Sequence, residues 1–390
     1  MAGPRLFVIA GEPSGDRLGA SLLDGLHTLA PGLTVEGLGG PLMEARGLRS
    51  RFDISELAVM GLVEVLPKIP RLLRRVRETA EAVIASRPDA LITIDSPDFC
   101  LRVAARVRKS MPGLTVIHYV APSVWAWRPE RAQKMAAHVD HVLALLPFEP
   151  PLMEAAGMTC DFVGHPVVSD PPPDPQAEVE LRAATGLHDR PFAVLLPGSR
   201  TGEIMRMGPV FREVAERISA IRPDLAWVVP TVAPQVDRVR ALFADSPLSP
   251  VVLDPRPLGS NAAEAQKRAA LGAARAALAA SGTVSLELAA AGTPMVIGYK
   301  ANWLTTRAVK RLAQIETATL VNILTKRMDV PEFLFEHCTA DKLSVALAKV
   351  LDDPKSRRTQ LIACTEALDM LGKGGDAPGL RAARSVLARL

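Results

Sequence analysis

AALAASGTVSLELAAAGTPMVIGYK, residues 276–300, is the stretch of the chain that decides the fold. Its small apolar residues 276–280 end at a polar turn, Ser281-Gly282-Thr283, and a second apolar run follows Gly292-Thr293-Pro294. Between the two runs lies a segment with helical spacing that carries one acidic residue, Glu287. A strand, a turn, a short helix and a second strand make a βαβ unit, so the pattern predicts an α/β protein with parallel strands.

The turn in this stretch is a candidate anion-binding site. A turn between a strand and a helix leaves unpaired N–H groups at the helix N-terminus, and these groups and the helix dipole favour an anion such as a diphosphate. Glu287 follows Thr283 by four residues, and a carboxylate at that place could accept hydrogen bonds from a ribose diol. The alternative is a Ser/Thr helix cap followed by a solvated glutamate.

The composition describes a globular protein with room for two domains. The chain has 390 residues, of which 48% are hydrophobic and 23% charged, and its formal net charge is +4. So small a charge does not indicate nucleic-acid binding. The four cysteines show no CxxC or Cys/His spacing, so we expect reduced thiols and neither disulfides nor a zinc site. We also expect no membrane-spanning segment, because no apolar run is long enough.

Two early strand ends carry polar residues. The apolar run 6–10 predicts a buried strand that leads into a loop, Gly11-Glu12-Pro13-Ser14-Gly15-Asp16, and the run 91–94 leads into Asp95-Ser96-Pro97-Asp98. Ligands of open α/β sheets bind outside the carboxyl ends of the strands, so both loops are candidate ligand contacts. Asp95 or Asp98 is a candidate general base. The alternative is a helix cap at Asp95 or Ser96, with Pro97 at an early helical position.

Aromatic and imidazole side chains gather between residues 125 and 141. Trp125 lies in a loop outside any periodic apolar stripe, which indicates either a binding wall or packing across a domain junction. His138 and His141 flank Asp140, but their spacing in a segment that passes from helix to strand points the imidazoles apart. We therefore expect no metal site there.

A proline-rich boundary divides the chain. Residues 169–175 (SDPPPDP) predict an extended linker. The α/β alternation restarts beyond it with the apolar run 192–196 and the loop Gly198-Ser199-Arg200. The N–H groups and the guanidinium of this loop would suit a phosphate. Residues 319–324 are expected to form an apolar loop with one amide, Asn322. We predict an α/β protein with two Rossmann-like doubly wound domains. The expected limits are 1–168 for the first domain, 169–178 for the linker, 179–340 for the second domain, and 341–390 for C-terminal helices that pack back on the first domain or on a partner.

Six motifs, taken in order, resemble the lipid-A-disaccharide synthase family. They are residues 11–16 (GEPSGD), 59–66 (VMGLVEVL), 95–99 (DSPDF), 123–128 (SVWAWR), 195–200 (LLPGSR) and 280–283 (ASGT). The family is an inverting glycosyltransferase with a GT-B-like pair of Rossmann-type domains, peripheral to the bacterial inner membrane. The resemblance implies condensation of UDP-2,3-diacylglucosamine with 2,3-diacylglucosamine 1-phosphate (lipid X), which gives the β-1,6-linked lipid A disaccharide 1-phosphate and UDP.

The resemblance implies roles for Asp95, Arg200, Glu287 and Asn322, and the strand-end loops described above supply the other candidate residues. Asp95 would be the catalytic base, with Asp98 as the alternative. The residues expected to bind the donor are Gly198, Ser199, Arg200, Ser281, Gly282, Thr283, Glu287 and Asn322. Those expected on the acceptor side are Glu12, Ser14, Asp16 and Trp125. Because the second domain has no DxD-type acidic cluster and cationic groups can stabilise the leaving diphosphate, we expect no metal and no other cofactor.

Residues 57–77 combine apolar and basic side chains, which is typical of a segment that lies on an anionic membrane. The residues expected to contact the membrane are Val63, Val65, Leu66, Ile69, Leu72, Arg71, Arg74 and Arg75. The alternative is a core-packed helix with a solvated basic face. We expect a cytoplasmic protein, peripheral on the cytoplasmic leaflet of the inner membrane, whose C-terminal helices are the place for a homodimer.

Two other functions share these features. Another GT-B-like enzyme of UDP-N-acetylglucosamine, either a lipid-acceptor transferase or an epimerase, would have the same domain pattern. A sugar-nucleotide-binding protein without turnover would leave Asp95 as a helix cap. A water-soluble acceptor would leave the apolar, basic segment 57–77 unexplained.

Overall fold

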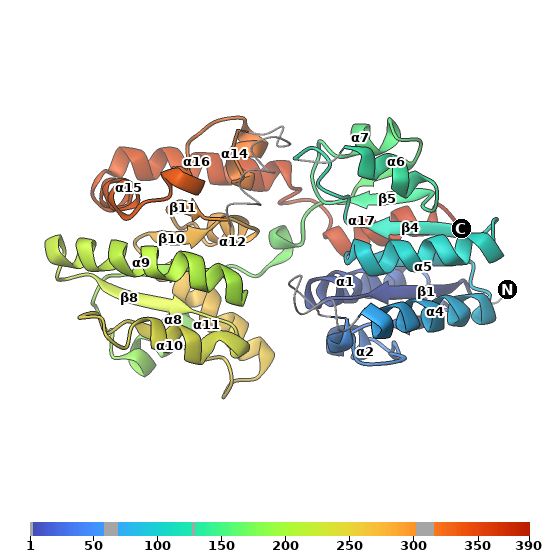
Figure 1. The fold of residues 1–390 in the computed structure, drawn as a ribbon, viewed down its shortest axis with the longest axis horizontal. Helices are drawn as coiled ribbons and strands as arrows, with labels where there is room; N and C mark the ends of the chain where they lie inside the picture. Colours follow the sequence, from blue (N-terminus) through green and yellow to red (C-terminus); the bar gives the residue numbers. More distant parts are fainter. Residues whose placement is uncertain (1–2, 58–68, 127–128, 302–315) are drawn as a thin grey trace. The chain divides into compact units, whose positions relative to one another are not determined.

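The structure, a computed structural model, describes residues 3–57, 69–126, 129–301 and 316–390. They form two compact units (Figure 1): unit 1 comprises Met1–Ser169 and Leu371–Leu390, and unit 2 comprises Asp170–Met370. In the described ranges each unit has one sheet of six strands, and every strand pairing is parallel. The predicted α/β class and the doubly wound layout are therefore confirmed.

Unit 1 builds its sheet in the order β2-β1-β3-β4-β5-β6. The strands are β1 (Arg5–Ala10), β2 (Thr34–Leu38), β3 (Ala90–Ile94), β4 (Thr115–Tyr119), β5 (His141–Ala144) and β6 (Thr159–Phe162). The helices are α1 (Pro13–Leu29), α2 (Pro41–Glu44), α4 (Ile69–Ser86), α5 (Pro97–Ser110), α6 (Glu130–Ala136), α7 (Pro150–Glu154) and α17 (Pro378–Leu387), with short 3-10 helices η1 (Ile54–Glu56) and η3 (Pro166–Ser169).

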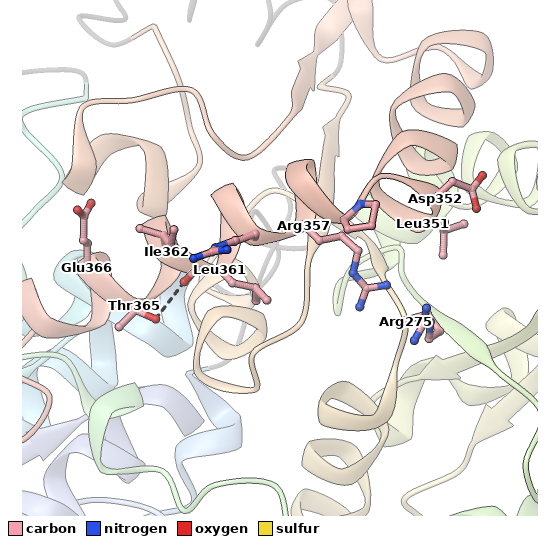
Figure 2. A pocket seen from close by; sticks show the side chains of 10 residues that line it. Arg275, Leu351, Asp352, Arg357, Leu361, Ile362, Thr365 and Glu366 are labelled. Carbon is pink, nitrogen blue, oxygen red and sulfur yellow. Dashed lines mark hydrogen bonds between the residues drawn. The ribbon is translucent and has the colours of Figure 1, made fainter.

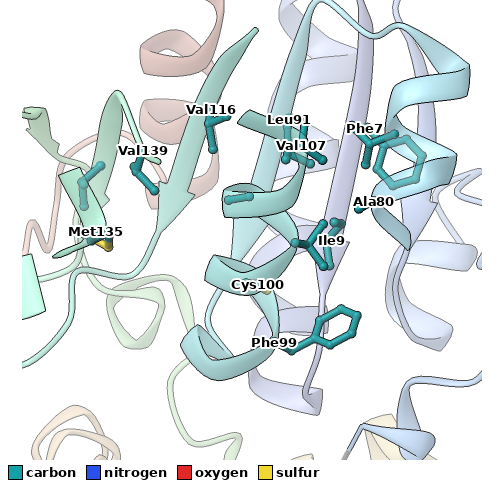
Figure 3. Close-up of a cluster of buried hydrophobic side chains, with 14 of the residues drawn as sticks. Phe7, Ile9, Ala80, Leu91, Phe99, Cys100, Val107, Val116, Met135 and Val139 are labelled. Atoms are coloured by element: carbon teal, nitrogen blue, oxygen red, sulfur yellow. The ribbon is translucent and has the colours of Figure 1, made fainter. Parts of the chain in front are cut away.

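Both faces of this sheet are buried, which explains why its strands read as continuous apolar runs. Successive side chains of a strand point to opposite faces. Leu6 and Val8 of β1 therefore join a core with side chains of α1 and α17, whereas Phe7 and Ile9 join a second core with side chains of α4 and α5. Figure 3 shows the second core, in which Phe7 and Ile9 lie beside Leu91 and face the helix that carries Val107.

The chain returns to unit 1 at its C-terminus. α17 packs along α1, and the two helices approach closely because Gly25 faces Gly379, whose carbonyl oxygen would lie 2.6 Å from a Cβ at position 25. The predicted C-terminal segment 341–390 is thus divided: residues 371–390 belong to unit 1 and residues 341–370 to unit 2. This division follows from packing, because the apolar face of each helix is buried where a sheet face lacks a cover.

Unit 2 builds its sheet in the order β12-β11-β10-β7-β8-β9. The strands are β7 (Phe192–Leu196), β8 (Ala226–Pro230), β9 (Val251–Leu253), β10 (Ala277–Ala280), β11 (Met295–Tyr299) and β12 (Glu332–Leu334). The helices are α8 (Pro175–Thr185), α9 (Thr201–Ile221), α10 (Val236–Leu242), α11 (Ser260–Ala273), α12 (Val284–Ala290), α14 (Leu320–Thr325), α15 (Ala340–Asp352) and α16 (Pro354–Met370), with short 3-10 helices η4 (Ala233–Gln235) and η5 (Phe335–His337).

Helices of unit 2 lie on both faces of its sheet. Side chains of α9 and α15 share one core with β7, β10 and β11, in which Phe211 is fully buried. α11 packs with α8, and α16 packs with α12 and α14. The β10-α12-β11 unit predicted from residues 276–300 is therefore an internal part of this unit, with β10 paired to both β7 and β11.

Two segments that the sequence predicted as loops are helical. α1 begins at Pro13, so Ser14 and Asp16 lie in its first turn, because proline at the first helical position has the φ that a helix requires. Residues 320–325 form α14 and bury Val321 and Leu324, whose three-residue spacing places them on one helix face.

Candidate functional site

The strand order of unit 2 reverses between β7 and β10. From β7 the sheet adds β8 and β9 on one side, and β10, β11 and β12 on the other. The loops after β7 and β10 therefore leave the sheet in different directions and open a crevice at the carboxyl ends of the strands. A cavity of about 700 Å³ lies there, and its wall includes Gly198, Ser199, Arg200, Ser281, Gly282, Thr283 and Glu287.

The turn after β10 presents open backbone to this cavity. A methyl group added at Gly282 would meet no atom within 4 Å, so the space beside the turn is open. Among the residues that the structure describes, the N–H groups of Gly282 and Thr283 have no hydrogen-bond acceptor. The turn therefore has the unpaired N–H groups that anion binding requires.

Glu287 lines the cavity together with Lys267, a residue that the sequence did not single out. Lys267 Nζ lies 2.6 Å from Glu287 Oε2, and the two side chains are 31% and 30% exposed. Lys267 comes from α11 and Glu287 from α12, so only the fold brings them together. The salt bridge orients the carboxylate and places a cation beside the turn.

The loop after β7 already has an internal carboxylate on its N–H groups. Glu203 Oε2 accepts hydrogen bonds from the N–H of Ser199 (3.1 Å) and Arg200 (3.2 Å), and Glu203 Oε1 lies 3.0 Å from Arg200 Nη1. Gly198 makes room for this arrangement, because a Cβ there would lie 2.5 Å from Glu203 Cβ. These N–H groups, which were predicted to suit a phosphate, therefore already have an acceptor in this structure, and phosphate binding there stays a prediction. Glutamate at the third helical position was the available signal, since it commonly caps a helix in this way.

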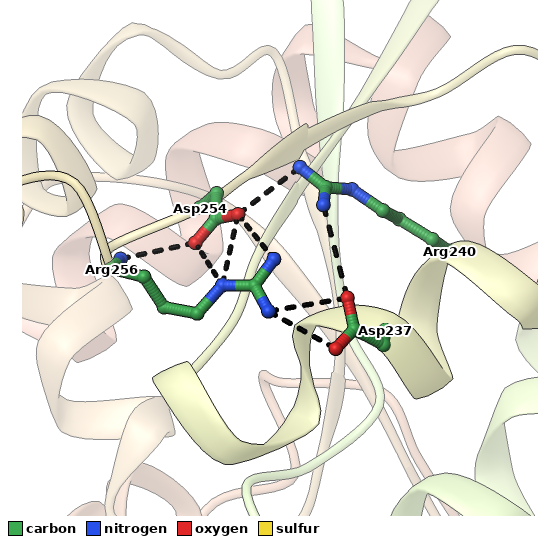
Figure 4. Close-up of polar contacts among 4 residues, drawn as sticks. All are labelled: Asp237, Arg240, Asp254 and Arg256. Carbon is green, nitrogen blue, oxygen red and sulfur yellow. Dashed lines mark hydrogen bonds and ion pairs between the residues drawn. The ribbon is translucent and has the colours of Figure 1, made fainter.

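An ion-pair network fixes another wall of the cavity (Figure 4). Arg256 Nη2 lies 2.7 Å from Asp254 Oδ2, and the network continues to Asp237 and Arg240. The hydrogen bond from Arg256 lowers the pKa of Asp254 to about 2, so this carboxyl stays ionised at neutral pH. Pro255, between the two paired residues, lines the cavity, so the network holds that loop in place.

Asn322 is not among the residues that line this cavity. Its side chain donates to the carbonyl oxygen of Val330 (2.9 Å) and accepts from the N–H of Val330 (3.0 Å), and the residue is 1% exposed. Because both ends of the amide are occupied, Asn322 holds the chain beyond α14 in this structure. Its contact with the donor stays a prediction.

The strand order of unit 1 reverses between β1 and β3, and a cluster of polar side chains lies at that edge. Ser14 Oγ donates to Asp95 Oδ2 (2.9 Å), the N–H of Ser96 donates to Asp95 Oδ1 (2.9 Å), and Ser96 Oγ donates to Glu12 Oε1 (3.1 Å). Gly11 permits this approach, because a Cβ there would lie 2.7 Å from Ser96 Oγ. Glu12, Ser14 and Asp95, which the sequence placed on two separate loops, are therefore brought together.

The backbone of this cluster is strained. Asp95 has a φ of 54° and Ser96 a φ of 43°, a region that non-glycine residues seldom adopt. Such strain persists only where surrounding contacts enforce it, and it is concentrated at functional sites. Here the strain turns the Asp95 carboxylate toward α1.

Two other predicted carboxylates lie elsewhere. Asp16 is 3% exposed and accepts hydrogen bonds from the N–H groups of Gly40, Leu42 and Met43 at 2.9 to 3.0 Å, so it caps α2 and is not an acceptor contact. Asp98 is exposed on the first turn of α5 and lines a separate groove. Asp95 is therefore the better placed of the two candidate bases.

Trp125 belongs to a packed wall. Its Nε1 donates to Glu149 Oε1 (3.2 Å), and its ring meets Phe148 edge-on at a centroid distance of 5.3 Å. Glu149 is 3% exposed, and its other oxygen accepts from the N–H of Leu146. Burial raises the pKa of Glu149 to about 7. Of the two sequence interpretations of Trp125, packing describes its observed contacts, although the partner is in its own unit.

The described part of the predicted membrane segment is divided between core and surface. Ile69 is 38% exposed and Leu73 is 51% exposed, whereas Leu72 packs against the core. The arginines Arg71, Arg74 and Arg75 pair with Glu56 or Glu78 at 2.7 to 2.9 Å. The expectation of Leu72 as a membrane contact is thus corrected, and the basic charge is largely neutralised. Val63, Val65 and Leu66 lie outside the described residues.

A second cavity of unit 2, of about 680 Å³, lies along α16 (Figure 2). Burial and the neighbouring Arg275 hold the pKa of Arg357 in its wall below the ordinary value. Arg275 precedes β10, so this cavity lies toward the amino ends of the strands. It is therefore separate from the strand-end site.

The buried carboxyl of Glu149 predicts a pH-dependent stability. Between about pH 4.3 and 7 the unfolded state loses the proton that the folded state retains, so the free energy of unfolding falls as pH rises. Glu149→Gln removes this titration, and relative to the wild type its stability should increase by on the order of 3 kcal/mol from pH 4 to 7.5. Urea unfolding at a series of pH values measures it. Glu154→Gln, an exposed change at the far end of α7, the helix that begins directly after Glu149, is the control, and equal pH profiles for the wild type and Glu149→Gln would contradict the prediction.

Solved structures share the fold of this chain. S. aureus MnaA in complex with UDP is similar with a TM-score of 0.66 and 13% identity, covering 98% of this chain and 95% of that one. UDP-GlcNAc 2-epimerase from Neisseria meningitidis, bound to UDP-GlcNAc, has a TM-score of 0.63 and 11% identity, with coverage of 99% and 98%. The calicheamicin glycosyltransferase CalG4 has a TM-score of 0.55 and 15% identity, with coverage of 100% and 98%. At such identities the likeness shows the fold alone, which is the GT-B-like arrangement that the resemblance implied.

Sequence comparisons identify the family. Lipid-A-disaccharide synthase from Ruegeria pomeroyi is 54% identical over 386 residues, which cover 99% of this chain and 95% of that protein. The enzyme of the same name from Rhodospirillum centenum is 43% identical over 383 residues, with coverage of 98% and 94%. The family model described as lipid-A-disaccharide synthetase matches residues 6–376. The chain therefore belongs to the lipid-A-disaccharide synthetase family of glycosyltransferases.

Proposed function

We propose that the protein condenses UDP-2,3-diacylglucosamine with 2,3-diacylglucosamine 1-phosphate and releases UDP, with inversion at the donor sugar. The observation that carries this proposal is the cavity of about 700 Å³ at the strand reversal of unit 2, with an open turn and the Lys267–Glu287 pair in its wall. Family membership supplies the class of substrates. It also favours transfer over epimerisation, since the epimerase named above is similar in fold alone.

In this mechanism the donor cavity stabilises the leaving group. When the bond between the donor sugar and its diphosphate breaks, negative charge develops on UDP. The N–H groups of Gly282 and Thr283, with the side chains of Lys267 and Arg200, are the cavity's donors for that charge. In this proposal Glu287 accepts hydrogen bonds from the ribose while its other contact is the ion pair with Lys267. Because cationic side chains take this role, we include no metal ion and no other cofactor in the proposal.

Asp95 removes the proton of the attacking acceptor hydroxyl. Ser14 Oγ and the N–H of Ser96 each occupy one of its oxygens, which fixes the direction of the carboxylate and leaves lone pairs for the acceptor. The new glycosidic bond forms from the face opposite the leaving UDP, which inverts the configuration. The proton ends on Asp95, and the electron pair of the broken bond leaves with UDP.

The acyl chains of both substrates also place the protein at a membrane surface in this proposal. No helix within the described ranges is both long and apolar enough to cross a bilayer. The exposed apolar residues at the start of α4, Ile69 and Leu73, are the described candidates for contact with the cytoplasmic leaflet. A homodimer through the C-terminal helices stays a prediction.

Wild-type protein in EDTA should release UDP from the donor only when the acylated acceptor phosphate is present. The substitution Asp95→Asn should lower kcat about 10²- to 10⁴-fold, because the transition state loses its base. Stopped or coupled assays of UDP release measure both effects. UDP affinity of Asp95→Asn should stay within a few-fold of the wild type. UDP release by the wild type without acceptor would contradict the reaction, and near-normal turnover by Asp95→Asn would contradict the role of that residue.

Arg200→Ala and Glu287→Ala should each weaken UDP binding by at least about 10-fold, because charge-assisted hydrogen bonds contribute about 1.5 to 3 kcal/mol each. Titration calorimetry with UDP measures the affinity. Arg217→Ala is the matched control, because Arg217 is an arginine on α9, paired with Glu213 and absent from the cavity wall. Unchanged affinity in both site variants would place the nucleotide elsewhere.

Leu73→Ser should reduce co-sedimentation with vesicles that contain anionic phospholipid, because an exposed leucine contributes about 1 to 2 kcal/mol when buried in the interface. Leu42→Ser, which removes an exposed leucine on α2 of the same unit, is the control. The membrane assignment fails if both variants sediment with vesicles as the wild type does.

A further inference from the structure

The groove of unit 1 that Asp98 lines lies between α5 and α6. Its volume is about 330 Å³, and its wall includes Pro97, Asp98, Arg102, Arg131, Lys134 and His138. Pro97 follows the end of β3 by three residues, and Pro122, also in the wall, follows the end of β4 by the same interval. The groove therefore begins at the edge of the sheet that carries Asp95 and runs along α5 and α6 toward the other edge, where His138 precedes β5 by three residues.

The groove is basic. Arg102 projects from α5, and Arg131 and Lys134 project from α6, whereas Asp98 is the single carboxylate in the described wall. Arg102 and Lys134 form no ion pair with any residue that the structure describes, unlike the arginines of α4, which pair with Glu56 and Glu78. Arg102 and Lys134 therefore share a wall in which Asp98 is the one described carboxylate, and the mutual repulsion of the two cations favours binding of an anion in the groove.

The position of these cations matches one chemical group of the proposed acceptor. Asp98 and Arg102 are four residues apart on one face of α5, so Arg102 lies one turn, about 6 Å, farther along the helix than Asp98. The acceptor carries its reacting hydroxyl at one end of a glucosamine ring and a phosphate monoester at the other. A sugar whose hydroxyl meets Asp95 and whose phosphate enters the α5–α6 groove would reach over the carboxyl end of β3, since Asp95 directly follows that strand and Pro97 lies in the groove wall.

We infer that Arg102 and Lys134, with Arg131 beside them, bind the phosphate monoester of the acceptor and so position its hydroxyl at Asp95. The inference rests on the proposed function and adds to it a subsite for one substrate. A guanidinium and an ammonium together suit a phosphate, since the first can bind two oxygens at once and the second acts as a point charge.

Steady-state kinetics in neutral-detergent micelles test the inference. Arg102→Ala and Lys134→Ala should each raise the KM for the acceptor at least about 10-fold, while the KM for the donor, UDP affinity and kcat stay within about three-fold of the wild type. Arg106→Ala is the matched control, because Arg106 is exposed on the same helix one turn farther on and is absent from the groove wall. Thermal unfolding checks that each variant is folded.

Kinetics with an acceptor that lacks the phosphate test whether the groove binds that group. If the groove binds that group, the wild type and Arg102→Ala should use the dephosphorylated acceptor equally poorly, because the lost interaction is the same. An unchanged acceptor KM, an equal loss in Arg106→Ala, or a loss that persists with the dephosphorylated acceptor would overturn the inference. So would reduced binding to anionic vesicles with an unchanged KM in micelles, which would assign these cations to the lipid surface. Absence of UDP release by the wild type would instead contradict the proposed function itself.

Discussion

The reversal of strand order between β7 and β10 is the constraint on which the site in unit 2 depends. All strands of a parallel sheet end at one edge, and the chain must leave each end toward one face or the other. At a reversal the two neighbouring loops separate, so a cavity forms without any residue being selected to create it. α11 and α12 then add Lys267 and Glu287 from segments that are not neighbours in sequence. In unit 1 the same reversal between β1 and β3 assembles Glu12, Ser14 and Asp95.

The charged side chains around the cavity of unit 2 form ion pairs with one another. Around the cavity of unit 2, Arg200 pairs with Glu203 and Lys267 with Glu287. Such partly exposed pairs contribute little to stability, so their main effect is to hold side chains in fixed directions. Glu203 has a further consequence, because its carboxylate occupies the N–H groups of the loop after β7. A phosphate could bind those groups only by exchange with this carboxylate, whereas the turn after β10 offers N–H groups without such competition.

The sequence predicted the features that depend on local pattern. Apolar runs marked the strands, and the polar residues that follow them marked the strand ends, so the fold class and the turn at Gly282 could be predicted. The hydrogen-bond partner of a side chain could not be predicted when that partner comes from a distant segment of the chain. Asp16 has a side chain that could bind a ligand, but its carboxylate accepts hydrogen bonds from the N–H groups of Gly40 and Met43 at the start of α2. Asn322 has a side-chain amide that could contact the sugar nucleotide, but both ends of that amide form hydrogen bonds with the backbone of Val330. A residue type indicates which bonds a side chain can make, and only the fold determines which of them it makes.

The assignment of the diphosphate to the turn after β10 is tested most directly by a crystal structure with UDP bound. We expect diphosphate density within hydrogen-bond distance of the N–H groups of Gly282 and Thr283, with the ribose beside Glu287. UDP density in another cavity, with the turn after β10 unoccupied, would contradict the assignment.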